Sequence, residues 1–97
     1  MMPVMDEEAE KKKSLRAFRQ LPGVGRVIAE DLWNLGLREM DELAGRDPEE
    51  LYEAHNRYRG AVQDRCMLYV FRCAVYYART PEEERMPDRL LWWNWKD

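Results

Sequence analysis

The stretch Leu21-Pro22-Gly23-Val24-Gly25-Arg26 constrains this chain more than any other part of its sequence. Apolar residues at helical spacing precede and follow it, so one helix should run into the stretch and another should run out. Pro22 cannot continue the first helix, and Gly23 and Gly25 can adopt backbone angles that are closed to other residues. The stretch therefore predicts a tight hairpin between two short helices.

The second helix of this pair would begin at about Arg26. Peptide N–H groups around Gly25 and Arg26 would then lie at a helix N-terminus without intrahelical partners, at the positive end of the helix dipole. A phosphate is the natural ligand of such a place. We therefore take Gly23, Val24, Gly25 and Arg26 as candidate phosphate-binding residues; the alternative is a turn that only lets two helices pack.

Helical periodicity describes the rest of the chain, and no segment alternates convincingly as a strand would. Asp47, Pro48 and Glu50 form a strong helix start, and Gly36 stands where a left-handed C-terminal cap is expected. The pattern predicts a flexible lead-in over residues 1–13 and helices over about 14–21, 26–35, 37–44, 47–56 and 61–79. The last of these is the most apolar, so we expect it at the centre of the core of a single all-α domain.

The net charge of −3 does not suggest a general binder of nucleic acid, but the charges are unevenly distributed. Residues 11–26 hold six basic side chains and no acidic one. Such a local basic patch predicts weak, salt-sensitive attraction to a polyanion. Within it we expect Lys13, Arg16 and Arg19 to support the hairpin; the alternative is an ordinary solvated helix face.

Other functional classes find little support in this sequence. No apolar run approaches the roughly 18 residues of a membrane helix, and no secretory signal is visible, so we expect a cytoplasmic protein. Cys66 and Cys73 lie too far apart in one expected helix for a disulfide, and buried core thiols are expected instead. With His55, expected at the surface, they lack the ligand spacing of structural zinc, so no metal site is predicted. No arrangement of residues favours catalysis, and we do not expect an enzyme.

The hairpin stretch, with Ala29 and Leu32 behind it, resembles a helix-hairpin-helix motif. That resemblance implies backbone N–H groups offered to a DNA phosphate, with Arg26 as the basic residue just after the glycines. It also implies a tandem arrangement: an intact motif over 14–36, a connector over 37–46 and a degenerate motif over 47–79. In the second copy only Gly60 remains of the glycines, and Asp64 stands where a small residue is expected. Arg57 and Arg59 beside Gly60 are candidates to hold a phosphate through their side chains instead.

Two further stretches, residues 64–78 and 92–97, are similar to a family of short bacterial helix-hairpin-helix proteins labelled "pathogenicity locus", some of which are called mitomycin resistance proteins. The likeness covers roughly residues 14–97. It implies a compact tandem helix-hairpin-helix (SAM-like) domain of about five helices with a short C-terminal helical tail, and a link to DNA damage.

Together these features predict a module that binds DNA without sequence specificity, in repair or recombination. The alternative is a protein-interaction adaptor that uses the fifth helix or the tryptophan-rich tail of residues 80–97. That tail is expected to fold back onto the core, with Trp92 and Trp95 on one face; stacking on unpaired bases and anchoring of a partner are the other interpretations. No cofactor is expected, although the hairpin holds a monovalent cation in some relatives of the motif, and the sequence does not decide this.

Overall fold

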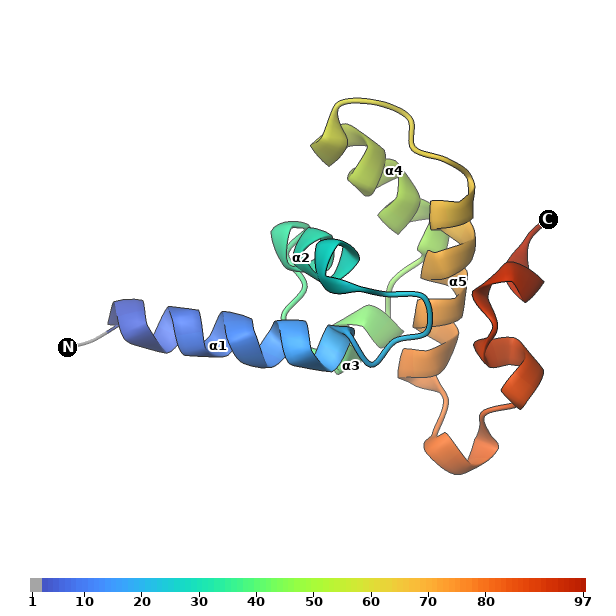
Figure 1. The fold of residues 1–97 in the computed structure, drawn as a ribbon, viewed down its shortest axis with the longest axis horizontal. Helices are drawn as coiled ribbons and strands as arrows, with labels where there is room; N and C mark the ends of the chain where they lie inside the picture. Colours follow the sequence, from blue (N-terminus) through green and yellow to red (C-terminus); the bar gives the residue numbers. More distant parts are fainter. Residues whose placement is uncertain (1–2) are drawn as a thin grey trace.

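The computed structural model describes residues 3–97; Met1 and Met2, which begin the predicted lead-in, lie outside the described residues. The described part is all-α, as predicted, and holds five α-helices followed by three short 3₁₀ helices (Figure 1). Their bounds are α1 Pro3–Phe18, α2 Arg26–Asn34, α3 Met40–Ala44, α4 Pro48–Arg59, α5 Cys66–Arg79, η1 Glu82–Glu84, η2 Pro87–Leu90 and η3 Trp92–Trp95.

Helix α5 occupies the centre of the molecule, which confirms the prediction from its apolar composition. It packs against α3 and α4 on one side and against η2 and η3 of the tail on the other. Its buried residues join side chains from each of the other four α-helices and from the loops between them in one hydrophobic core, made of Phe18, Leu21, Val24, Ala29, Leu32, Leu37, Leu43, Leu51, Val70, Phe71, Ala74 and Val75. A single core of this kind is what a chain of 97 residues can build.

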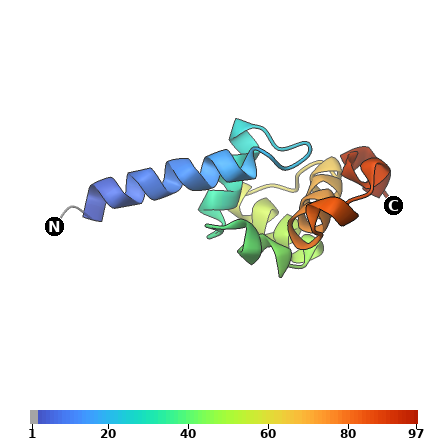
Figure 2. The same ribbon diagram turned by 90° about the horizontal axis from the view of Figure 1, so that it is seen from below.

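Helix α1 begins at Pro3 and not near Ser14, where the apolar spacing predicted its start. Its first half projects away from the other helices, as Figures 1 and 2 show. Helix-forming residues explain the extension, because Pro suits the first helical position and each Glu of the pair Glu7 and Glu8 precedes a Lys by four residues. Apolar periodicity detects only the half of the helix that packs.

Three helix boundaries depend on caps. Gly36, at φ +98°, ends α2 as predicted, and Leu37 N–H donates to Leu32 C=O at 3.1 Å, as in a Schellman motif. Helix α4 continues past the predicted end at Asn56 until Gly60, at φ +76°, caps it. Helix α5 begins at Cys66, so the prediction of a helix from Ala61 is wrong: Asp64 Oδ1 accepts the Cys66 N–H at 2.8 Å and sets the start there.

The tail folds back along α5 and is held at its last residues by charge-assisted bonds. Asp97 accepts a hydrogen bond from Arg65 Nε at 2.6 Å and forms an ion pair with Arg72 Nη2 at 3.0 Å. Arg72 Nη1 also donates to Trp95 C=O at 2.7 Å. Hydrogen bonds from Arg65 and then Arg72 lower the pKa of Asp97 to about 2. Trp92 packs against the edge of the core. The tail is thus part of the folded domain.

Candidate functional site

The glycine hairpin, residues 21–26, is anchored in the core by its apolar members. Leu21 is 2% exposed and Val24 is 7% exposed, and Val24 N–H donates to Leu21 C=O at 3.1 Å across the turn. Gly23 adopts φ +77°, a left-handed conformation that favours glycine. The turn is therefore rigid at both ends, and it delivers the chain to the start of α2.

The N-terminus of α2 is open. Gly25 is its N-cap in an extended conformation, and its C=O accepts the first intrahelical bond from Ala29 at 2.9 Å. Among residues 3–97, no acceptor lies within hydrogen-bond distance of the N–H groups of residues 25–28. A Cβ placed on Gly25 would meet no atom within 4 Å, so the approach to these donors is unobstructed. Four donors at the positive end of a helix dipole, beside the exposed Arg26, suit an anion.

The corresponding end of α5 is already occupied. The carboxylate of Asp64 accepts the Cys66 N–H, and this backbone hydrogen bond lowers the pKa of Asp64. A carboxylate at that position takes the place that a phosphate would need. The N-terminus of α2, in the first half of the chain, is therefore open, whereas the N-terminus of α5, in the second half, is capped by Asp64.

In the second candidate hairpin, Gly60 and Arg59 have roles within the fold. Gly60 ends α4, and the loop after it is held by Gln63 N–H, which donates to Asn56 Oδ1 at 2.8 Å. Arg59 donates through Nη2 to both oxygens of Asp31, at 2.9 and 2.8 Å, which raises the pKa of Arg59. Arg57 is exposed. Of the two candidate phosphate ligands, Arg59 is therefore bound within the protein.

The partner of Arg59, Asp31, is buried on α2 and also contacts His55 of α4. His55 Nε2 lies 2.9 Å from Asp31 Oδ2, and the imidazole packs edge-on against Phe71 at 5.6 Å. His55 is 2% exposed, so its predicted surface position is wrong. The spacing of His55 four residues after the apolar Leu51 places both on one face of α4 and could have indicated that His55 is buried. Its partner Asp31 on α2 is not indicated by the sequence. This cluster ties the two halves of the domain together.

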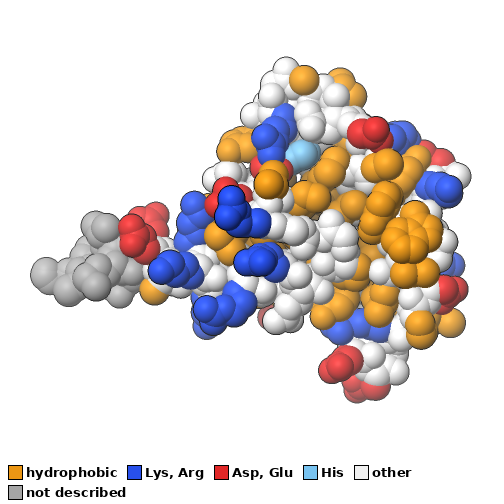
Figure 3. All heavy atoms as spheres, viewed as in Figure 1, with side chains coloured by type: hydrophobic (Ala, Val, Ile, Leu, Met, Phe, Trp, Pro, Cys, Tyr) orange, Lys and Arg blue, Asp and Glu red, His pale blue; other side chains and the backbone are white. Residues whose placement is uncertain are grey.

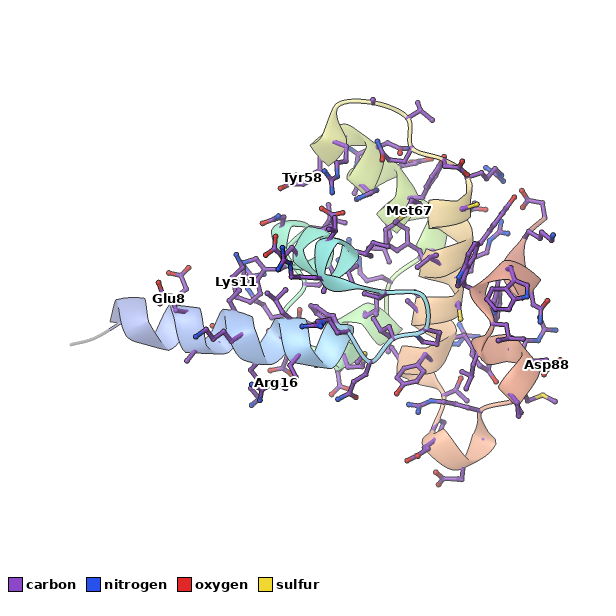
Figure 4. The ribbon with its side chains drawn as sticks, in the orientation of Figure 1. Glu8, Lys11, Arg16, Tyr58, Met67 and Asp88 are labelled. Carbon is purple, nitrogen blue, oxygen red and sulfur yellow. The ribbon has the colours of Figure 1, made fainter. Side chains whose placement is uncertain are left out.

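The basic residues near the hairpin surround α1. Figure 3 shows Lys and Arg side chains gathered over α1 and α2. Lys13, Arg16 and Arg19 are all exposed, but in Figure 4 Lys11 and Arg16 point to opposite sides of α1. The residues therefore raise the local positive potential without forming one continuous face.

The two cysteines are free thiols, but only Cys73 is buried. Burial raises the pKa of Cys73 to about 11. Cys66 is exposed at the first residue of α5, so the expectation of two buried thiols is wrong for this one. Within residues 3–97, His, Cys, Asp and Glu side chains form no group of three suited to a metal ion.

Comparison with known proteins gives two matches. The family model "Cdd1: Pathogenicity locus" matches residues 11–97. The "Mitomycin resistance protein McrB" of Streptomyces lavendulae is 36% identical over 75 residues, which are 77% of this chain and 66% of that protein. The match thus spans just under two thirds of the relative's length. No solved structure matches the chain significantly. No described helix has the length and apolar character needed to cross a bilayer.

Proposed function

The chain belongs to the family described as Cdd1, pathogenicity locus, and we propose that it binds the DNA backbone without sequence preference through the glycine hairpin. The observation that carries this proposal is the open N-terminus of α2, where the N–H groups of residues 25–28 have no acceptor in the described chain and Arg26 lies exposed beside them. Among the long helices described in residues 3–97, only α2 combines a glycine turn, an uncapped start and a following arginine.

The mechanism is electrostatic. The N–H groups and the Arg26 guanidinium donate to phosphate oxygens, and the basic side chains of α1 add attraction at longer range. Phosphate contacts position a protein on DNA and carry no sequence information. With two to four phosphates neutralised, the slope of log affinity against log salt is expected to be about −2 to −4.

A role in DNA repair or recombination extends this proposal. The relative from Streptomyces lavendulae is called a mitomycin resistance protein, and that name supports a link between the family and DNA damage. The biochemical part of the proposal is independent of this link and is tested first.

The test is a titration by fluorescence anisotropy with labelled duplex, single-stranded and branched DNA at about 50 and 200 mM salt. We expect binding that weakens as salt rises. Arg26→Glu should lower the affinity at least tenfold, since it replaces a phosphate ligand by a like charge. Arg79→Glu, an equal charge change at an exposed position in the last turn of α5, is the matched control and should change the affinity far less. The proposal fails if wild-type protein does not bind any of these DNAs at about 50 mM salt.

A second candidate function is that of a protein-interaction adaptor. The tail exposes three large apolar side chains, Met86, Leu91 and Trp93, which are 57%, 39% and 48% exposed, and these could contact a partner. Helix α5 suits this role less than the sequence suggested, because α3, α4 and the tail cover most of it. The adaptor hypothesis predicts no DNA binding in the same titration.

A further inference from the structure

The tail and the glycine hairpin form one continuous surface. A Cβ on Gly23 would lie only 2.7 Å from Cδ1 of Trp92, so the indole of Trp92 packs directly on the hairpin backbone. Figure 1 shows the hairpin at one edge of α5 and η3 along its other edge, and the contact between Gly23 and Trp92 joins them. A ligand bound at the hairpin would therefore lie beside the tail.

Trp93 is the most exposed tryptophan on this surface. Its ring meets Trp92 edge-on, with centroids 5.7 Å apart and planes at 85°, and it remains 48% exposed. The other three are engaged within the fold: Trp33 is buried under Arg38, Trp92 packs on the core, and Trp95 donates its N–H to Arg89 C=O at 2.8 Å. Trp93 is therefore the tryptophan whose ring face is available to a ligand.

The exposed indole is also held in place. Asn94 Nδ2 donates to Asp88 C=O at 2.9 Å, and the residues that follow are fastened to α5 through Asp97 and Trp95. A ligand therefore meets an ordered ring and does not have to immobilise a loose terminus, which lowers the entropic cost of binding.

We propose that Trp93 is a base-stacking platform and that the preferred ligand of this surface is a DNA strand with unpaired bases. The inference rests on the proposed backbone contact at the hairpin. Proteins that bind single strands combine a positive path for the backbone with aromatic side chains on which bases stack. Here the open N-terminus of α2 and Arg26 take the phosphates, and Trp93, reached through Trp92, takes a base. A fully paired duplex offers no free base face to the ring away from its ends.

The experiment compares full-length wild type, Trp93→Ala and Trp93→Phe by anisotropy on a single strand, a gapped duplex and a closed hairpin duplex without free ends. Trp93→Ala should weaken binding to the single strand and the gapped duplex by about 5- to 150-fold and leave the closed duplex unchanged. Trp93→Phe should retain most of the affinity because it keeps an aromatic face. Met86→Ala, which removes another exposed apolar side chain of the tail, is the control and should have no effect.

The salt dependence supplies a readout that a purely structural role would not reproduce. Stacking neutralises no phosphate, so the salt slope of Trp93→Ala on a single strand should equal that of the wild type. Equal losses on all three DNAs, or a shallower slope, would show that the substitution damages the hairpin and would overturn the stacking role. Unchanged affinity on the single strand, with wild type still bound, would overturn the inference alone. Absence of wild-type binding would remove the proposed function and the inference with it.

Discussion

Replacing Gly25 by Asp should strengthen the fold while it weakens DNA binding. Gly25 has φ −97° and ψ −163°, an ordinary extended conformation, and a Cβ there meets no atom within 4 Å, so the substitution introduces no strain. Asp is a preferred N-cap, and its carboxylate can accept from the open N–H groups of α2. The gain over Gly is a few tenths of a kcal/mol from the cap plus about 0.3–1 kcal/mol from the helix dipole. The melting temperature should rise by about 2 to 10 °C.

The same carboxylate occupies the donors that a phosphate needs and places a negative charge against it. Two like charges about 4 Å apart repel by about 1 kcal/mol in water and about 4 kcal/mol near a protein surface. The affinity for DNA should therefore fall about 5-fold to several-hundred-fold, and the salt slope should become shallower by about one phosphate. Gly25→Asn supplies a similar cap without the charge, and its affinity should lie between those of the wild type and Gly25→Asp.

The assays are thermal denaturation followed by circular dichroism and anisotropy with one duplex across a salt series. A Gly25→Asp protein that melts higher and still binds like the wild type would refute the assignment of the phosphate to α2. Equal losses for Asp and Asn would show that the charge is not responsible.

Three further predictions concern the fold around the site. Gly23→Ala should destabilise the domain by about 2–4 kcal/mol in urea denaturation, because φ at this position is +77° and the new Cβ would meet Trp92. The control Gly45→Ala, at φ −95° with open space around it, should be nearly neutral, and an equal loss of stability in both variants would contradict the argument. Asp31→Asn should lower the free energy of unfolding by about 1–3 kcal/mol, because it removes the carboxylate that both Arg59 and His55 contact. The control Glu30→Gln, at an exposed position, should cost less than about 0.5 kcal/mol. Equal stability of the two variants would exclude a stabilising role for the cluster. The pKa of Asp97 is depressed from an ordinary 3.8 to about 2, so its contribution to stability is complete above about pH 4 and is lost as the pH falls toward 2. Tryptophan fluorescence should report release of the tail in that pH interval. Asp97→Asn should lack this transition.

Much of the fold is predictable from the sequence because residues next to each helix boundary determine where the helix begins or ends. The hairpin, the cap at Gly36 and the start of α4 at Pro48 each depend on residues that adjoin the boundary. The start of α1 was missed because side chains that touch no core leave no apolar period, and helix propensity alone extends the helix. The start of α5 was missed because the apolar Ala61 and Val62 appeared to continue the periodicity, although Asp64 is a cap.

The contacts that define the candidate site were less accessible from sequence. Asp31, His55 and Arg59 come from two helices, and Gly23 and Trp92 are separated by most of the chain. Nothing within any one segment indicates these pairs, because each joins two elements that meet only in the folded chain. The sequence identified the open helix N-terminus, but only the fold shows which other elements reach it.

These long-range contacts explain why the two halves of the domain are not equivalent. In the second half, Asp64 caps the N-terminus of α5, and Arg59, a candidate phosphate ligand, is bound by Asp31 of the first half. The Arg59–Asp31 pair links α4 to α2, and the Asp64 cap fixes the first residue of α5. The second half therefore supports the first, in which the N-terminus of α2 is left without a cap. A support of this kind predicts that substitutions at Arg59 act on binding through stability, whereas substitutions at Arg26 act on binding directly.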